Sequence, residues 1–550
     1  MLHLFQSFIG TGDQFLVGRF VCLIIALCVI IATCLCLFQK SRWKLHQIYF
    51  IAVFSMGLIF MCTLPPLSAP DEILHFTGAY ALSNQMMGQP VRDEDGHVRI
   101  RQEDEYLVNW PGDDDPCKAT VLGQTLDRSV YEAMHEKGLF HATETGTSIT
   151  LQQPVKTTPC AYLLPALGIT LARLLKLSAV GLVLLGRFMN LLLFAILGAM
   201  TVRRTPIGKE LFFAISLFPM TLELAGSYSY DSFIIAKELF FAISLFPMTL
   251  ELAGSYSYDS YIIALSFYLT AVILDFALAK PSTGITRKNV IELSVLALLL
   301  SPCKMIYATL FLLCLLIPVQ KWGARPWPKW ILSVLLIGAL IVGSILLVNF
   351  REVLRYVNAS GVTQAPEFTS SGDVNTVKLH DLAELIHDRT LVFRIIRNTL
   401  QILGGQFLGT TVGMWLGAFD RGLTTPVPML VLFWTGTLLL AITGRREEPA
   451  LSIPRRVWMV LIFLLLGFIL MVSMLLAYTP ADTFYILGVQ GRYFLPFLPV
   501  LLLAFRTPRL HRLRAIGRVG IGLDALLLSV MLLMDALVLL GCFLTVVQRA

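Results

Sequence analysis

The sequence carries little charge. Only 14% of its 550 residues are Asp, Glu, Lys or Arg, whereas charged residues make up about 25% of a soluble globular domain. Hydrophobic residues make up 56% of the chain, and its mean hydropathy is +0.73. This composition excludes a soluble globular protein and indicates a lipid environment.

Several motifs of soluble enzymes are also absent. The sequence has no glycine-rich phosphate loop, no Cys-x-x-Cys pair and no two histidines four residues apart. These absences argue against a P-loop nucleotide site, a dithiol redox site and a helical zinc site. We expect no secretory signal peptide, because the first apolar run, Leu16–Phe38, is too long for one and lacks a small-residue cleavage site.

What the sequence has in abundance is apolar runs of roughly 20 residues, the length of helix that crosses a hydrocarbon core of about 30 Å. Lipid offers no partners to exposed backbone groups, so these runs must be helical. We predict an all-α fold, a polytopic bundle of about 12 transmembrane helices in one integral membrane domain over residues 1–550. The clearest predicted spans are Leu16–Phe38, His46–Leu64, Ala179–Met200, Trp330–Asn349, Pro426–Thr443, Val457–Tyr478, Tyr493–Phe505 and Ile521–Leu544.

The net charge of +7 is spread over short loops between the apolar runs. Such Lys- and Arg-rich loops stay in the cytoplasm, so the charge gives a topology and no nucleic acid partner is expected. Residues 1–46 then form an N-terminal span with a basic cytoplasmic loop, and residues 65–159 and 350–425 form long external loops. Amphipathic helices are expected at Cys160–Lys176 and Leu391–Leu403, and the break at residues 301–304 predicts a helical hairpin.

Residues 209–264 contain a tandem repeat. Lys209–Ala236 and Lys237–Ala264 are copies of one unit that differ only at Phe233 and Tyr261. A functional repeat array needs at least three units, so the pattern indicates a recent duplication or an error in the recorded sequence. A span through the junction would put charged residues in lipid, so we expect one copy to lie at an interface or to form a short hairpin.

An acidic motif follows the second span. On a helix the side chains of Asp71, Glu72 and His75 converge, and together they can act as a general base or hold a divalent metal at Asp71 and Glu72. The alternative is structural, because Ser68-x-x-Asp71 resembles a capping box and acids stabilise a first helical turn.

Other charged residues lie near the predicted outer ends of spans. In the segment Gly488–Pro496, the planar guanidinium of Arg492 can bind a phosphate through two hydrogen bonds, with Gln490 and Tyr493 beside it. The alternative is an interfacial arginine beside an interfacial tyrosine. Further candidates for substrate binding, each with an ordinary interfacial or capping alternative, are Arg187 with Asn190, Lys304, Asp231 and Asp259. Cys117 and Cys160 fall in the external loop, where a disulfide can form if the two meet.

The stretch Pro66–Met87 resembles the Pro-x-x-Asp-Glu-x-x-His-Phe signature of a bacterial family of predicted membrane proteins, the one numbered 2142 among domains of unknown function. Three further segments match this family in order, and the resemblance covers roughly residues 47–510. They are Leu185–Asn190, the Leu-Phe-Pro-Met-Thr…Ser-Tyr-Asp unit, and Val489–Pro496. The extra N-terminal span and the duplicated unit depart from the family pattern, and the second departure leaves open whether Asp231 or Asp259 holds the family position.

That family is similar to the GT-C class of glycosyltransferases, which take a sugar from a polyprenyl-phosphate carrier outside the membrane. The resemblance implies that Asp71, with Glu72, is the catalytic acid–base group. The expected partners are a polyprenyl-phosphate sugar donor and an envelope glycan or lipid acceptor at the outer face of a bacterial inner membrane, with Arg492 and Lys304 or Arg187 on the lipid phosphate. A divalent metal is optional. The rival interpretations are a transporter or flippase for a lipid-linked or anionic solute, and an inactive relative that serves as a scaffold. Charges at span ends favour the enzyme, because a transporter needs them near the midplane.

Overall fold

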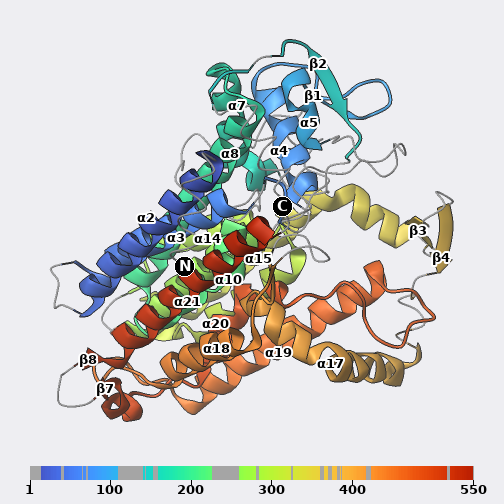
Figure 1. The fold of residues 1–550 in the computed structure, drawn as a ribbon. Helices are drawn as coiled ribbons and strands as arrows, with labels where there is room; N and C mark the ends of the chain where they lie inside the picture. The colour runs from blue at the N-terminus through green and yellow to red at the C-terminus, as the bar shows by residue number, and fades with distance from the viewer. Residues whose placement is uncertain are drawn as a thin grey trace.

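The computed structural model describes residues 14–38, 43–64, 66–69, 72–108, 140–142, 144–152, 159–225, 259–279, 284–323, 326–358, 364–368, 374–378, 380, 385, 387–416, 423–516 and 521–548. Most of these residues are helical (Figure 1). The prediction of a mainly helical chain is therefore confirmed.

The first half of the chain forms a series of helices of very different lengths. They are α2 (Gln14–Phe38), α3 (Leu45–Thr63), α4 (Glu72–Met86), the 3-10 helix η1 (Gln102–Asp104), α5 (Glu105–Val108), α7 (Pro159–Leu174), α8 (Ala179–Arg204), α9 (Lys209–Ser216), α10 (Pro219–Ala225) and α13 (Asp259–Leu278). The second half contains α14 (Arg287–Leu300), η4 (Met305–Leu316), η5 (Val319–Trp322), α15 (Pro326–Asn358), α17 (Arg389–Val412), α18 (Val427–Ile442), α19 (Ile453–Tyr478), η6 (Gly491–Phe497), α20 (Leu498–Ala504), η7 (Pro508–Arg514) and α21 (Leu523–Gln548).

Four helices in the described residues are long and apolar enough to cross a membrane. They are Ala179–Arg204, Pro326–Leu346, Ile453–Leu476 and Leu523–Gly541, and shorter apolar helices accompany them. Each of the four matches a predicted span, so the structure supports a membrane protein built from apolar helices. The total of about 12 spans stays a prediction.

The expectation of an all-α fold needs a correction. The described loops contain four antiparallel strand pairs, in which the strands are β1 (Val98–Arg101) with β2 (Thr147–Thr150), β3 (Gln364–Phe368) with β4 (Val374–Lys378), β5 (Trp415–Leu416) with β6 (Leu423–Thr424), and β7 (Ala515–Ile516) with β8 (Ile521–Gly522). These segments of two to five residues are too short to cross lipid, and pairing gives their backbone groups hydrogen-bond partners. The first loop thus contains the strand pair β1–β2 in addition to α4 and α5, and α7 follows it.

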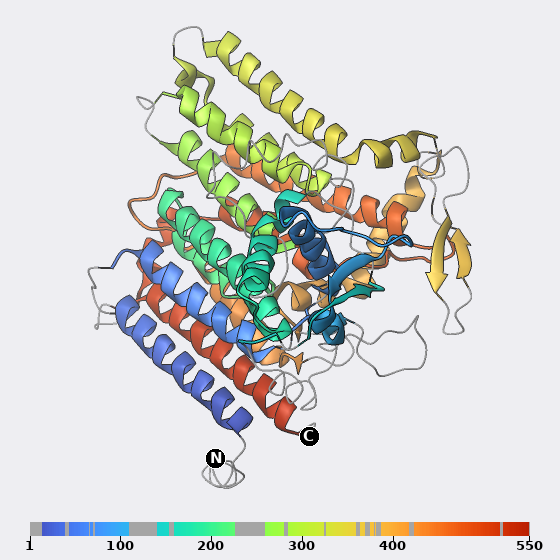
Figure 2. The same cartoon turned by 90° about the horizontal axis from the view of Figure 1, so that it is seen from above.

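The first loop gathers at one end of the molecule. Figure 1 shows α4, α5, α7 and the β1–β2 pair together beyond the end of α8, and Figure 2 shows α2, α3 and α21 running side by side along one edge. The chain therefore separates a layer of apolar helices from a smaller, more polar unit that contains the acidic motif.

Small residues let α7 and α8 cross closely. A Cβ on Gly168 would lie 2.8 Å from both the Cα of Gly186 and the carbonyl oxygen of Leu185, so a side chain there would collide with the backbone of α8. Close helix contacts through small residues are the usual packing of membrane helices. Ser178 starts α8, since its Oγ accepts a hydrogen bond from the N–H of Gly181 at 3.1 Å.

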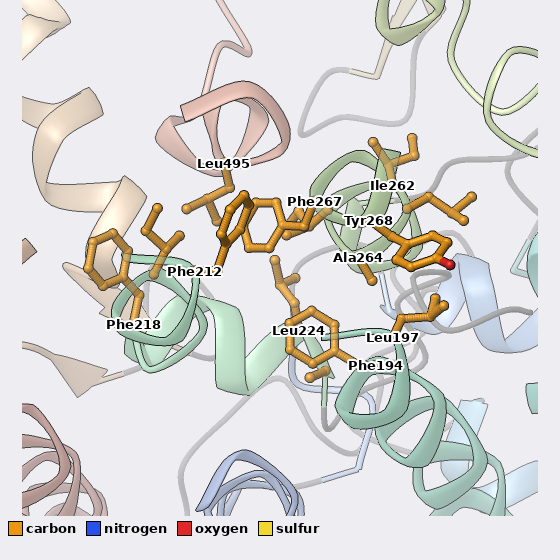
Figure 3. Packing of buried hydrophobic residues seen from close by; sticks show 14 of the residues in the cluster. Phe194, Leu197, Phe212, Phe218, Leu224, Ile262, Ala264, Phe267, Tyr268 and Leu495 are labelled. Atoms are coloured by element: carbon orange, nitrogen blue, oxygen red, sulfur yellow. The ribbon is translucent and has the colours of Figure 1, made fainter. Parts of the chain in front are cut away.

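Helix α13 lies at the centre of the apolar core. Figure 3 shows Phe267 and Tyr268 of α13 among side chains of α8, α9, α10 and η6, with the labelled neighbours Phe194, Leu197, Phe212, Leu224 and Leu495. All of these side chains are buried. The packing joins elements from the start and the end of the chain around one helix.

The duplicated unit contributes to this core from both copies. The described part of the first copy forms α9 and α10, which are short and almost entirely buried. The end of the second copy begins α13 at Asp259. Residues 226–258, which include the junction between the copies, lie outside the described residues, so the predicted interfacial or hairpin placement is not tested.

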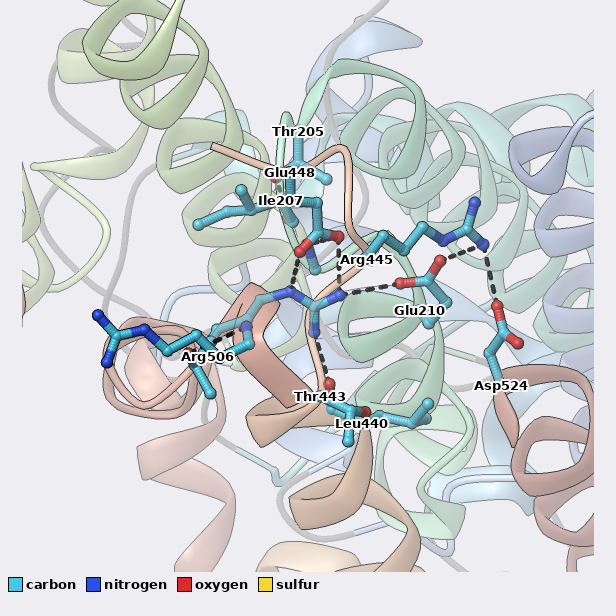
Figure 4. A network of polar contacts seen from close by, with 12 residues as sticks. Thr205, Ile207, Glu210, Leu440, Thr443, Arg445, Glu448, Arg506 and Asp524 are labelled. Carbon is cyan, nitrogen blue, oxygen red and sulfur yellow. Dashed lines mark hydrogen bonds and ion pairs between the residues drawn. The ribbon is translucent and has the colours of Figure 1, made fainter. Parts of the chain in front are cut away.

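An ion-pair cluster ties the other end of the bundle together (Figure 4). Buried Arg506 contacts Glu448 at 2.6 Å and Glu210 at 3.3 Å, and Glu210 also pairs with Arg445, which reaches Asp524. These acids come from α9, the α18–α19 loop and α21. Arg445 and Arg506 lie in short basic loops between apolar runs, and in the structure they also join three distant segments.

Candidate functional site

The acidic motif begins at a turn between α3 and α4. Leu67, within this turn, is buried and has φ of 61°, a left-handed conformation that a bulky residue rarely adopts. The N–H of Ala69 donates to Oε2 of Glu72 at 3.2 Å, and the N–H of Glu72 donates to the carbonyl of Ala69 at 3.1 Å. The capping role predicted for the motif is therefore filled by Glu72. Asp71 lies outside the described residues.

Glu72 also forms a buried ion pair with Arg187. The guanidinium donates from Nε to Oε1 at 2.7 Å and from Nη2 to Oε2 at 2.6 Å, and each side chain is only 1% exposed. Nη1 of Arg187 donates to the carbonyls of Met61 and Leu64 at 3.3 and 3.2 Å. One arginine on α8 thus satisfies carbonyls at the end of α3 and fixes the start of α4.

His75 faces α7, one helical turn after Glu72. Its Nδ1 lies 3.4 Å from the hydroxyl of Tyr162, and His75 is 5% exposed. The structure therefore places Glu72, His75 and Arg187 in one buried region, which we call the acid group. Asn190, one turn beyond Arg187, is fully buried in the same helix.

Two of the predicted phosphate-binding residues, Lys304 and Arg492, lie around the predicted Tyr493. With Tyr307, which the sequence analysis did not select, they form a second set that we call the cation group. The Nζ of Lys304 lies 4.1 Å from the ring centroid of Tyr493, and the guanidinium carbon of Arg492 lies 5.3 Å from the same centroid. Tyr307 donates its hydroxyl to the carbonyl of Tyr493 at 2.9 Å. Arg492 is only 2% exposed, so it is not an arginine that reaches to a water interface. Gln490 precedes η6 and accepts at its carbonyl from the N–H of Tyr493.

Helix α13 contacts elements that carry each of the two groups. This helix packs along α8, which carries Arg187, and against η4 and η6, which carry or adjoin the cation group. Asp259 is the first residue of α13, although its side chain, like that of Cys160, is not described. Asp231 and Cys117 lie outside the described residues, so the predicted disulfide and the role of either Ser-Tyr-Asp copy stay predictions.

Comparison with protein-family models gives a match over most of the chain. The model of the predicted membrane protein family DUF2142 matches residues 54–239 and 235–501. The chain belongs to this family. No curated protein and no solved structure matches it. In this DUF2142 protein the two matched segments meet at residues 235–239, where the first copy of the duplicated unit ends at Ala236 and the second begins at Lys237.

The structure explains the glycine in the motif before Arg492. A Cβ on Gly491 would lie 2.1 Å from the carbonyl oxygen of Phe407 and 2.3 Å from the N–H nitrogen of Thr411. The N–H of Gly491 donates to Oγ1 of Thr410 at 2.9 Å, and its carbonyl accepts from Oγ1 of Thr411 at 3.1 Å. Only glycine fits this contact, which holds η6 and the cation group against α17.

The predicted metal site at Asp71 and Glu72 gains no direct support from the described geometry, because both Glu72 oxygens accept from Arg187. The described residues do contain a group that sequence reasoning missed: Asp93, Asp95 and His97 offer ligand atoms within 4.8 Å of one another. The backbone N–H of His97 donates a hydrogen bond to Oδ1 of Asp93. Desolvation raises the pKa of Asp93, but the hydrogen bonds that its carboxylate accepts outweigh desolvation and lower this pKa. Partly exposed acidic turns of this kind are common without an ion, so we assign no metal to it.

One further acid in this DUF2142 protein was missed. Asp535 lies inside α21, within a candidate span, and it is fully buried. No described group donates a hydrogen bond to either of its carboxylate oxygens. The signal was in the sequence, because an acid inside an apolar run of this length is by default a functional candidate.

Proposed function

We propose that this DUF2142 protein is a glycosyltransferase that takes a sugar from a polyprenyl-phosphate carrier at the outer face of a bacterial cytoplasmic membrane. It transfers the sugar to an envelope glycan or lipid. The observation that carries the proposal is the buried Glu72–Arg187 pair, because it fixes the start of α4 beside Asp71, the residue to which the resemblance assigns the chemistry.

In the proposed reaction Asp71 is the general base. The acceptor hydroxyl attacks the anomeric carbon of the sugar, its proton passes to the Asp71 carboxylate, and the bond from the anomeric carbon to the phosphate oxygen breaks. Arg187 offsets the charge of Glu72. Asp71 and Glu72 therefore do not repel each other as two uncompensated negative charges. Glu72 and Arg187 are then positioning residues, and His75 lines the same region.

The cation group would hold the leaving phosphate. Lys304 and Arg492 both lie against the ring of Tyr493, at 4.1 and 5.3 Å from its centroid, and we propose that one anion contacts both. Arginine adds a bidentate fork to the point charge of lysine. Two fixed cations stabilise the charge that grows on a departing phosphate.

A divalent metal is not required by this arrangement. A cation between Asp71 and Glu72 would compete with Arg187 for the Glu72 oxygens, both of which it already occupies. The residues therefore fit a mechanism in which arginine and lysine carry the positive charge.

The test in cells is a comparison of envelope glycans. Cells that carry Asp71→Asn should lose the glycan modification that the wild-type protein supports, since asparagine cannot accept the proton. The variant must be present in the membrane at the wild-type level. A full modification in cells with Asp71→Asn would rule out Asp71 as the base.

The rival function is a transporter or flippase for a lipid-linked or anionic solute, and Asp535 favours it. A buried acid inside a span is typical of proteins that move protons or solutes. In proteoliposomes, a transporter would move a labelled polyprenyl-phosphate sugar across the bilayer without transfer, and Asp535→Asn would stop that movement. Under the glycosyltransferase proposal Asp535→Asn leaves transfer near the wild-type rate, because Asp535 touches no reacting group.

A further inference from the structure

A pocket of about 380 Å³ lies away from both the acid group and the cation group. It is formed by the C-terminal end of α4, strand β1, the start of β2 and the end of α7, all in the polar unit at one end of the molecule (Figure 1). Its volume falls within the range of small-ligand sites, about 300–1,000 Å³. None of its lining residues belongs to one of the four long candidate spans.

Three arginines line this pocket: Arg99, Arg101 and Arg173. Arg101 has a carboxylate partner, since it donates to both oxygens of Asp104 at 2.8 Å. Burial opposes the charge of Arg101, yet the hydrogen bonds and the charge of Asp104 outweigh it and raise the pKa of Arg101. Asp104 also accepts from Tyr80 at 2.7 Å, so Arg101 and Asp104 form a fixed, neutral wall.

Arg173 is held only by neutral groups among the described residues. It donates to Oγ of Ser83 at 3.1 Å, to Oδ1 of Asn84 at 2.8 Å and to Oε1 of Gln89, and it lies 4.8 Å from the ring centroid of Tyr80. These contacts fix the guanidinium without cancelling its charge. Desolvation lowers the pKa of Arg173, so a bound anion would relieve the cost of its burial.

Arg99 adds a second charge that no described carboxylate offsets. Its backbone carbonyl accepts from the side chain of Asn84 at 2.7 Å, so Asn84 fixes the backbone of Arg99 and the guanidinium of Arg173. Arg99 and Arg101 lie two residues apart on β1 and share one face of the strand. The pocket thus holds a net positive charge on a rigid frame.

The rest of the lining identifies the class of ligand. Gln89 and Thr147 supply amide and hydroxyl groups, while the lining contains no aromatic residue on which a nucleobase would stack. Guanidinium groups bind phosphate or carboxylate oxygens bidentately, and amides and hydroxyls pair with sugar hydroxyls.

We propose that the pocket bounded by Arg99, Arg101 and Arg173 binds an anionic saccharide, a sugar that bears a phosphate or carboxylate. This goes beyond the proposed function and does not depend on it, because binding here is separate from transfer at Asp71.

Calorimetric titration of the full-length protein in detergent with glucose 1-phosphate, inorganic phosphate and glucose tests this inference. We expect glucose 1-phosphate to bind more tightly than either of the other two probes. Arg99→Gln and Arg173→Gln should each weaken its binding at least tenfold, and Arg173→Lys should weaken it less. Arg397→Gln, an exposed arginine on α17, is the matched control and should bind as the wild-type protein does.

Unchanged binding in Arg99→Gln and Arg173→Gln would overturn the inference, as would equal affinity for inorganic phosphate. Displacement of the probe by phosphatidylglycerol would identify a lipid site and overturn the saccharide assignment. Arg99 has no described side-chain partner, so Arg99→Gln decides the question if Arg173→Gln does not fold. Asp71→Asn should bind glucose 1-phosphate normally, which separates a failure here from a failure of the proposed glycosyltransferase.

Discussion

At the scale of single residues, several buried charges among the described residues have specific partners. Glu72 and Arg187 lie 115 residues apart in the sequence yet form a two-bond ion pair. Sequence reasoning selected both residues as functional candidates, and it also selected Lys304, Arg492 and Tyr493. Their pairing was not predictable, because it depends on how α3, α4 and α8 pack and not on the periodicity of any one helix. Asp535 was overlooked although its position in an apolar run was visible.

The Glu72–Arg187 pair predicts strong coupling in stability. Arg187→Met leaves Glu72 buried without its cation and should lower the free energy of unfolding by about 3–5 kcal/mol. Glu72→Gln combined with Arg187→Met should recover roughly 1–3 kcal/mol of that loss. Thermal unfolding in detergent measures both.

The control pair combines Glu72→Gln with Arg287→Met, since Arg287 is exposed at the start of α14, and its two effects should add. If the effects of Glu72→Gln and Arg187→Met on the free energy of unfolding also added, the ion pair would not stabilise the turn between α3 and α4. Transfer should stay reduced in the recovered double variant, because positioning of Asp71 is not restored.

Gly491 gives a second prediction at this scale. Gly491→Ala forces the backbone of η6 away from α17 and should cost about 1–3 kcal/mol of the free energy of unfolding. Gly404→Ala, on α17 with no atom within 4 Å of the added Cβ, should instead stabilise the protein by about 0.5–1 kcal/mol. Similar melting temperatures for the two variants would contradict the close contact.

At the scale of elements, helix positions were largely predictable and loop structure was not. His46–Leu64 was predicted and α3 covers Leu45–Thr63, while Ala179–Met200 was predicted and α8 extends to Arg204. Apolar length and flanking charge fix such helices. The 3-10 segments η4 and η6 and the β1–β2 pair were missed, because their geometry depends on neighbouring elements and on short polar turns.

The duplicated unit yields the prediction at this scale. Deletion of Lys209–Ala236 should leave an inserted protein with the wild-type melting temperature and activity. The deletion removes α9 and α10, but the remaining copy repeats their sequence and can take their place before α13. Deletion of Lys237–Ala264 should behave alike, since the two products differ only in Phe233 or Tyr261. Loss of membrane insertion in either deletion would show that both copies are needed.

At the scale of the whole molecule, the chain combines a bundle of apolar helices with a polar unit built from its first loop. The family match, the four candidate spans and the buried core agree on a membrane protein. The external position of residues 65–159 is still a prediction from the basic loops. If it holds, the acid group and the anionic-saccharide pocket occupy the same side of the membrane.

The most direct test of the central claim is a measurement of both donor binding and sugar transfer by purified protein in proteoliposomes that contain a polyprenyl-phosphate sugar. Asp71→Asn should abolish transfer and leave donor binding close to that of the wild-type protein. Arg492→Ala should weaken donor binding, and Arg492→Lys should restore part of it, because lysine keeps the charge and loses the bidentate fork. Wild-type transfer in Asp71→Asn together with unchanged donor binding in Arg492→Ala would contradict the account.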